Sequence, residues 1–120
     1  MKLYHGTHRI NLESIEQNGL RPSRIGIVYL SPKPKAAYHF GDDEILLEVE
    51  TGDIKLTAFE DCSDWEVLCW GYISPENIKQ IYFCDICEQI FKDNVEYLSH
   101  LHQDIECDNL IIHEKSNYSQ

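Results

Sequence analysis

The sequence predicts an α+β fold, with a mixed, strand-rich domain that contains two short helices and a small C-terminal ββα unit. Three observations predict this. Short runs rich in β-branched and aromatic residues alternate with turn residues over the first two thirds of the chain. Two stretches instead carry helix start and stop signals. The composition changes at Cys84, where closely spaced cysteines and histidines replace the strand pattern.

The expected strands are residues 2–5, 25–30, 44–50, 54–58, 65–72 and 78–83. The run over 44–50 is mostly Ile, Leu and Val with little alternation, which predicts a strand at the centre of the sheet. An acidic loop is expected over 59–64. These elements define a first domain over residues 1–83.

The two helices are predicted from their capping residues. Asn11 is expected to cap the first helix, which reaches about residue 17, and Gly19 provides its left-handed stop. Ser31 is expected to cap the second helix, with Pro32 at its first position and the helix body over 35–40.

Composition limits the classes of function. The chain has 120 residues, 42% of them hydrophobic, enough for one domain with a small appendage. A formal net charge of -11 argues against broad binding to nucleic acid or anionic lipid, because phosphate contacts depend on Lys and Arg. No run approaches the roughly 18–20 apolar residues of a membrane span, and no signal peptide precedes the first strand. We therefore expect a soluble, cytoplasmic protein.

The segment after residue 83 has the spacing of a zinc site. Cys84 and Cys87 form a C-x2-C pair, and twelve residues separate Cys87 from His100. His102 and Cys107 are five residues apart and can share one helix face. We predict Cys84, Cys87, His102 and Cys107 as ligands of a structural Zn²⁺, with His100 as the alternative histidine.

The expected finger spans residues 84–113, followed by a disordered tail over 114–120. Phe91 with Tyr97 or Leu98 would form its small apolar core. Between Cys84 and Cys107 there are six acidic residues, and Lys92 is the only fixed positive charge. A finger that reads DNA needs Arg or Lys along its helix. The finger is therefore predicted to be a structural cap or a surface for a protein partner.

Three motifs in the first domain carry candidate chemistry. The chain begins with Tyr4-His5-Gly6-Thr7, where the missing Cβ of Gly6 would let a flat ligand approach the main chain. The second motif is Tyr29-Leu30-Ser31, followed by Ala36-Ala37-Tyr38. The third is Trp65-Glu66-Val67-Leu68, in which a carboxylate on an apolar strand face is costly unless it is paired or used. The same residues also fit ordinary roles, as a strand-end histidine, core tyrosines and a solvated glutamate.

In this order the motifs resemble the ADP-ribosyltransferase superfamily, in the His–Tyr–Glu branch of diphtheria toxin and the poly(ADP-ribose) polymerases. The resemblance covers about residues 2–83 and excludes the finger. It implies a compact, mixed, mainly antiparallel split β-sheet as the core of this domain. The Glu66-Val67-Leu68 strand before the Ile-x-Pro-x-x-Ile turn at 73–78 is also similar to DNA-targeting ADP-ribosyltransferase toxins.

The resemblance implies NAD as the substrate and a role for each matching residue. His5 would hydrogen-bond the adenosine-side ribose, and the Gly6 backbone would hold the nicotinamide carboxamide. Tyr29 and Tyr38 would sandwich the nicotinamide ring. Glu66 would hydrogen-bond the 2′-hydroxyl of the nicotinamide ribose and stabilise an oxocarbenium-like transition state. Catalysis would thus rest on His5, Tyr29 and Glu66, and the NAD-binding set would also include Thr7 and Ser31.

The implied activity is mono-ADP-ribosyl transfer, with release of nicotinamide and a protein as acceptor. Polymer synthesis is disfavoured, because enzymes that build long polymers usually carry an additional regulatory domain. Such a transferase is expected as a phage or bacterial effector, in the host cytoplasm if it is phage-encoded. Two alternatives stay open: a module that binds ADP-ribose or a related nucleotide without cleaving it, and a zinc-finger interaction protein whose first domain is only a scaffold.

Overall fold

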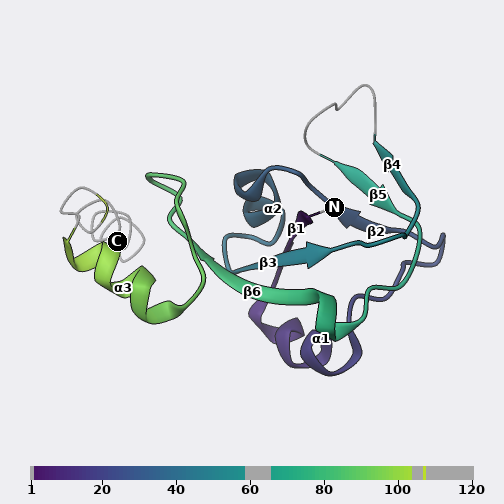
Figure 1. The fold of residues 1–120 in the computed structure, drawn as a ribbon, viewed down its shortest axis with the longest axis horizontal. Helices are drawn as coiled ribbons and strands as arrows, with labels where there is room; N and C mark the ends of the chain where they lie inside the picture. The colour runs from purple at the N-terminus through teal and green to yellow at the C-terminus, as the bar shows by residue number, and fades with distance from the viewer. Residues whose placement is uncertain (1, 59–65, 104–106, 108–120) are drawn as a thin grey trace, which may run out of the picture. The chain divides into compact units, whose positions relative to one another are not determined.

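All strand pairs in the described part of the chain are antiparallel, and they form two sheets (Figure 1). This computed structural model describes residues 2–58, 66–103 and 107. The predicted acidic loop and the predicted tail lie outside these residues. The α+β class and the split sheet are confirmed, whereas the expected mixed pairing is not found among the described strands. The chain divides into two units, Met1–Ile81 and Tyr82–Gln120.

The larger sheet has the order β1-β3-β6-β7, and the smaller sheet has the order β2-β5-β4. The strands of these sheets are β1 (Lys2–Thr7), β2 (Val28–Leu30), β3 (Ile45–Glu50), β4 (Leu56–Ala58), β5 (Val67–Cys69), β6 (Ile78–Phe83) and β7 (Ile90–Phe91). β3 lies between β1 and β6, so its predicted central position is confirmed. The short β2 begins after Gly26, which has a φ of 87° and donates its N–H to the Ser23 carbonyl in a turn.

Two short helices belong to the first unit, α1 (Leu12–Asn18) and α2 (Pro34–Phe40). Single 3-10 turns precede α1 at Arg9–Asn11 and β6 at Pro75–Asn77. α1 starts after Asn11 as predicted, and Gly19 ends it with a φ of 76°. The Asn11 side chain forms no cap, because its amide donates to Thr7 Oγ1 at 3.3 Å.

The predicted start of the second helix is wrong. α2 begins at Pro34 with Lys33 as its N-cap, and Pro34 rather than Pro32 occupies the first turn. Ser31 stays extended because it pairs with Tyr4: the Tyr4 N–H donates to the Ser31 carbonyl at 2.8 Å, and the reverse bond is 2.9 Å long. A long-range backbone contact therefore overrides a local capping signal.

α2 packs directly against β1 through two glycines. A Cβ on Gly6 would lie 1.7 Å from the Ala37 carbonyl oxygen, and a Cβ on Gly41 would lie 2.4 Å from the Thr7 nitrogen. The space left by the missing Gly6 side chain is thus filled by the helix. Gly6 is therefore required for backbone packing, and the predicted approach of a ligand to its main chain cannot come from the side that the helix fills.

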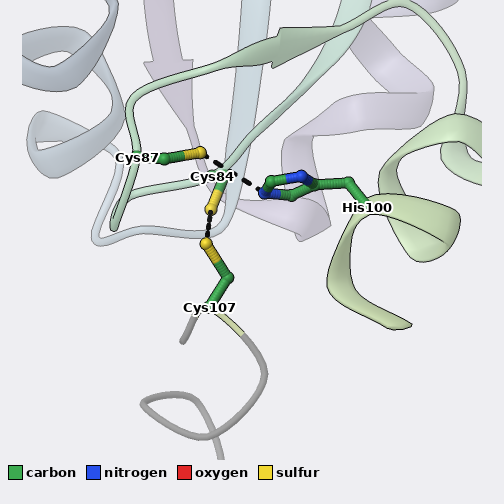
Figure 2. A group of neighbouring side chains, drawn as sticks. All are labelled: Cys84, Cys87, His100 and Cys107. Carbon is green, nitrogen blue, oxygen red and sulfur yellow. Dashed lines mark hydrogen bonds between the residues drawn. The ribbon is translucent and has the colours of Figure 1, made fainter. Parts of the chain in front are cut away.

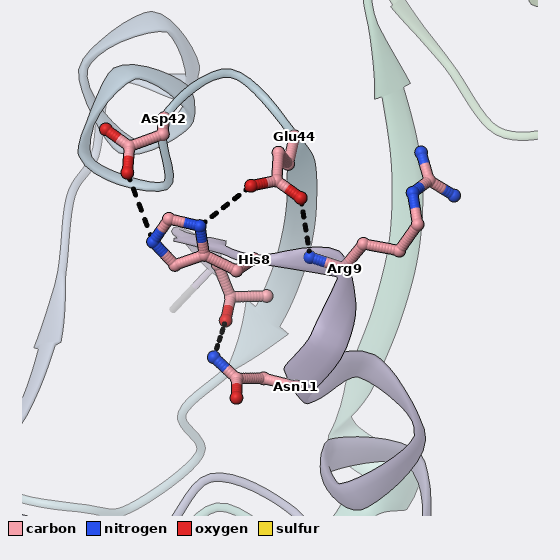
Figure 3. A network of polar contacts seen from close by, with 6 residues as sticks. His8, Arg9, Asn11, Asp42 and Glu44 are labelled. Atoms are coloured by element: carbon pink, nitrogen blue, oxygen red, sulfur yellow. Dashed lines mark hydrogen bonds and ion pairs between the residues drawn. The ribbon is translucent and has the colours of Figure 1, made fainter.

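A polar network connects the end of β1 to the turn between α2 and β3 (Figure 3). His8 Nδ1 lies 2.8 Å from Glu44 Oε2, and His8 Nε2 lies 3.2 Å from Asp42 Oδ2. The Arg9 N–H donates to Glu44 Oε1 at 3.1 Å. Asp42 and Asp43 have φ values of 56° and 60°, which non-glycine residues seldom adopt, so this network holds a strained turn.

The core of the first unit forms where both sheets and α1 meet. Its buried members are Leu3, Ile15, Leu20, Val28, Leu30, Ile45, Leu47, Val49, Val67, Cys69 and Ile73, with Leu12 packed at its edge. The predicted inward orientation of Leu12 and Ile15 is thereby confirmed. Within the smaller sheet, Val28, Leu30, Val67 and Cys69 face this core, so the intervening residues lie on the opposite face.

The second unit has the element order strand, strand, helix. Tyr82 and Phe83 at the end of β6 pair with β7, and α3 (Asn94–Gln103) follows. The ring of Tyr97 stacks on Tyr82 and is tilted against Phe91, with centroid distances of 6.2 and 5.9 Å. Of the two predicted core partners, Tyr97 thus contacts Phe91, whereas Leu98 is exposed. No helix within the described residues has the length and hydropathy of a membrane-crossing segment.

Candidate functional site

A pocket of about 240 Å³ opens on the first unit. Its lining comes from β1, β2 and the residue that follows it, α2, and the residue that precedes β5, namely Tyr4, His5, Gly6, Tyr29, Leu30, Ser31, Ala37, Phe40 and Glu66. Five predicted site residues are among them: His5, Gly6, Tyr29, Ser31 and Glu66. Two, Thr7 and Tyr38, are not. Three stretches far apart in the sequence therefore contribute to one hollow.

Strand alternation places Tyr29 and Glu66 on the same face of the smaller sheet. Tyr29 pairs with Leu68, while their neighbours on β2 and β5 face the core. Because side chains alternate with a period of two, Glu66 lies on the same face as Leu68 and hence as Tyr29. This face forms one wall of the pocket.

His5 is oriented by the backbone of β2. Its Nδ1 lies 2.9 Å from the Tyr29 carbonyl oxygen, which can only accept, so Nδ1 carries the proton. Burial lowers the pKa of His5 below its ordinary value, and the bond to the Tyr29 carbonyl offsets this only in part. The neutral imidazole therefore presents Nε2 as a hydrogen-bond acceptor at neutral pH.

The Gly6 backbone faces the pocket along the edge of β1. Tyr4 uses both its N–H and its carbonyl to bind Ser31, on the side of β1 that is opposite β3. In an antiparallel strand these groups alternate in direction, so the N–H and carbonyl of Gly6 point to the same side as those of Tyr4. A donor and an acceptor are thus placed side by side at the pocket.

The aromatic partner of Tyr29 at the pocket is Phe40 and not Tyr38. Residues two apart on a helix point about 200° away from each other, so Tyr38 and Phe40 cannot both face the pocket. Phe40 lies three residues after Ala37, which also lines the pocket, and its side chain is 66% exposed. The spacing within the helix does not by itself identify Phe40, because the contact of Ala37 with Gly6 sets which face of α2 meets the pocket.

A second hollow of about 430 Å³ shares His5 and Tyr29 with this pocket. Thr7, a predicted site residue, lines this hollow and is itself buried. Further polar lining comes from Asn11, Ser14, Asn18, Arg21 and Ser23. Sequence reasoning does not identify this hollow, because its residues come from β1, α1 and the connection to β2.

The second unit contains a cluster of four metal-ligating side chains, Cys84, Cys87, His100 and Cys107 (Figure 2). Their ligand atoms lie within 4.8 Å of one another. Cys84 Sγ is 3.5 Å from Cys107 Sγ, and Cys87 Sγ is 3.3 Å from His100 Nε2. Ligands of a tetrahedral zinc ion are separated by roughly 3.5–3.8 Å. Three thiols and one imidazole at these distances fit zinc.

The histidine of the cluster is His100, the predicted alternative, and the first choice of His102 is wrong. The two residues are two positions apart on α3, so they point to different sides of the helix. The His100 ring also contacts the Phe91 ring, with the two ring centres 4.9 Å apart. The predicted ligands Cys84, Cys87 and Cys107 are all present in the cluster.

The turn between the two cysteines shapes the electrostatics of the cluster. The Glu88 N–H donates to the Cys84 carbonyl at 2.7 Å, and Glu88 has a φ of 61°. Burial raises the pKa of Cys84, but the N–H groups of Cys87 and Ile86, together with His100 and Cys107, bring it down to about 7. Burial and the adjacent Cys84 raise the pKa of Cys107. A metal ion that binds both sulfurs would displace a proton from this pair.

Comparison with known proteins leaves the family of the chain open. No protein-family model and no curated protein matches it. The geometry of the pocket and of the cysteine–histidine cluster is therefore the basis for assigning a function.

Proposed function

We propose that the first unit is an NAD-dependent mono-ADP-ribosyltransferase and that the second unit is a ββα-type finger with a structural Zn²⁺. The observation that carries the proposal is the convergence of His5, Tyr29 and Glu66, from three distant stretches of sequence, on one pocket. An imidazole acceptor, an aromatic ring and a carboxylate are the groups that NAD cleavage needs.

The pocket suits the nicotinamide end of NAD. The paired N–H and carbonyl of Gly6 match the acceptor and donor of a carboxamide. Tyr29 and Phe40 offer aromatic faces for a flat ring, and Ser31 adds a hydroxyl at the same pocket. A ring held in this way is oriented for departure at little entropic cost.

Glu66 provides the electrostatic contribution to catalysis. Breaking the bond between nicotinamide and ribose leaves the electron pair on nicotinamide and positive charge on the sugar. A carboxylate that already faces the sugar stabilises this charge as it develops. The acceptor then forms the new bond to the anomeric carbon with its own electron pair and loses a proton. His5 Nε2 would accept a hydrogen bond from a ribose hydroxyl.

The second hollow accounts for the remainder of the dinucleotide. At about 240 Å³, the pocket beside Glu66 is too small for all of NAD, so the adenosine and phosphates need another binding surface. The second hollow shares His5 and Tyr29 with the pocket and is lined by Arg21, whose guanidinium suits a pyrophosphate.

The test is nicotinamide release from NAD by the wild-type chain and by Glu66→Gln. The substitution keeps the shape of the side chain but removes its charge, so release should fall by about 100-fold or more. Glu13→Gln, an exposed change in the first turn of α1, is the matched control and should release nicotinamide at the wild-type rate. Equal release by wild type and Glu66→Gln would exclude Glu66 from the chemistry. NAD binding without any release would instead identify a non-catalytic nucleotide-binding module.

A further inference from the structure

An exposed aromatic side chain lies on the smaller sheet, on the strand that begins beside Glu66. Trp70 is 42% exposed although it follows the fully buried Cys69. Its Nε1–H donates to Thr57 Oγ1 at 3.0 Å, and Lys55 Nζ lies 5.9 Å from the centre of its ring. These cross-strand contacts hold the indole in place and leave a rigid apolar surface in contact with solvent.

Trp70 lies on the same face of the sheet as Glu66. The backbone N–H of Trp70 donates to the Lys55 carbonyl at 2.9 Å, so the pairing of β5 with β4 continues past Cys69. With a period of two, residues 66, 68 and 70 share the face that forms the pocket wall. Glu66 and Trp70 are four positions apart along extended chain, a distance of about 13 Å.

We propose that Trp70, Lys55 and Thr57 form the acceptor-binding surface of the transferase, an inference that rests on the proposed function. The surface binds an extended segment of an acceptor protein. An aromatic or large apolar side chain of that segment packs on Trp70, and a neighbouring carboxylate pairs with Lys55. A residue three or four positions away then reaches the ribose held at Glu66, because an extended chain covers the same distance per residue as β5.

The chemistry of this surface favours a protein over a nucleic acid. Lys55 is its only fixed positive charge, and the whole chain carries -11, whereas a bound strand of nucleic acid needs several phosphate contacts. The indole N–H of Trp70 already donates to Thr57 Oγ1, so the ring is left for apolar contact. Tryptophan is among the residues that are enriched at the energetic hot spots of protein interfaces.

The experiment measures two steps separately. Nicotinamide release from NAD reports cleavage, and transfer of biotin-labelled ADP-ribose to a positional library of ten-residue peptides reports acceptor use. Trp70→Ala should raise the KM for peptides so that kcat/KM for transfer falls about 10–30-fold, the loss typical of an aromatic anchor, with nicotinamide release unchanged. Lys55→Gln should remove only the preference for an acidic residue in the peptide.

Two further variants make the outcome unambiguous. Ile10→Ala truncates an apolar side chain that is 89% exposed in another element, and it should transfer like wild type. Trp70→Phe keeps a ring with less change to the fold and should retain most of the transfer. The inference is overturned if Trp70→Ala transfers like wild type, or if release and transfer fall together. Absence of nicotinamide release by the wild-type chain would overturn the proposed function itself, and this inference with it.

Discussion

The two units of the chain differ in how many apolar side chains each of them buries. The first unit buries eleven side chains in one cluster, contributed by strands of both sheets and by α1. In the second unit, the described residues that are buried are Phe83, Cys84 and Cys107, and α3 has no buried residue. Two of these three are members of the metal-binding cluster. A hydrophobic core therefore accounts for the first unit, whereas the described residues of the second unit bury few apolar side chains around a cluster that could hold a metal ion.

This difference predicts that the pocket and the cysteine–histidine cluster depend on different parts of the chain. The first unit has a core large enough to support a pocket whose walls come from distant strands. The described residues of the second unit make few apolar contacts, which is the usual situation of small metal-dependent modules. The two units should consequently respond to different perturbations, and each response can be measured separately.

Loss of the metal should have the largest effect, and it should be confined to the second unit. Zinc contributes on the order of 10–16 kcal/mol to the folding of small finger modules, more than this unit can replace. His100→Ala should abolish stoichiometric zinc binding and remove amide-exchange protection from α3, while β1 and β3 stay protected. His102→Ala is the matched control, because it truncates a histidine of the same helix outside the cluster. Zinc loss in His102→Ala but not in His100→Ala would reverse the ligand assignment.

A cavity in the core should instead destabilise the first unit and leave the second unit unchanged. Leu47 lies on the central strand and is 1% exposed, so Leu47→Ala should cost the first unit about 2–5 kcal/mol in urea unfolding. The zinc affinity of the second unit should not change. Leu98→Ala truncates a leucine that is 47% exposed and should alter neither quantity. Parallel loss of zinc affinity in Leu47→Ala would show that the units do not fold independently.

The contact of α2 with β1 predicts an effect of intermediate size. Gly6→Ala would bring its Cβ against the Ala37 carbonyl and displace α2, at a cost of about 1–3 kcal/mol in thermal or urea unfolding. The same displacement would move Phe40 and weaken ligand binding at the pocket. Gly52→Ala is a useful comparison, because Gly52 has a φ of 56° but none of the described residues comes within 4 Å of where its Cβ would lie. Gly52→Ala would introduce only backbone strain. An equal loss of ligand binding in both variants would therefore contradict the role of the contact between Gly6 and Ala37 in positioning the pocket.

Local signals in the sequence are sufficient to predict much of this arrangement. The run over 44–50 identifies the central strand by its composition, and the C-x2-C pair with Cys107 identifies three members of the candidate metal cluster. The motifs of the first domain point to His5, Tyr29 and Glu66, and all three line one pocket. In each case the information lies in residue type and spacing, which do not depend on the rest of the fold.

Prediction fails where a contact between distant residues decides the outcome. Ser31 has the side chain of a helix cap but pairs with Tyr4 as a strand. Phe40 rather than Tyr38 faces the pocket, and His100 rather than His102 belongs to the cluster, because the rotation of each helix is set by packing. The tight approach of Ala37 to Gly6 is likewise invisible in the sequence, since it joins two elements about thirty residues apart.

The smallest expected effect is a pH dependence of the network around His8. The hydrogen bond to Glu44 is the main cause that raises the pKa of His8, and the same bond lowers the pKa of Glu44. The stability that His8 contributes to the folded state is fully present below the pKa of His8 in the unfolded chain. It is lost as pH rises through the higher pKa of His8 in the folded chain. The contribution of Glu44 is present above its unfolded pKa and is lost as pH falls through the lower folded value.

His8→Gln should therefore lower the thermal midpoint most in the window between these two transitions, at about pH 5–6. At pH 8.5 wild type and variant should differ less, because His8 is then neutral in both the folded and the unfolded chain. These groups are exposed, so 1 M NaCl should shrink the difference at pH 5.5. A difference in midpoint that stays constant across this pH range would show that His8 acts by packing and not by its charge. In that case van der Waals packing of His8, and not its charge, stabilises the strained turn at Asp42 and Asp43. The position of α2 beside the pocket would then not depend on pH.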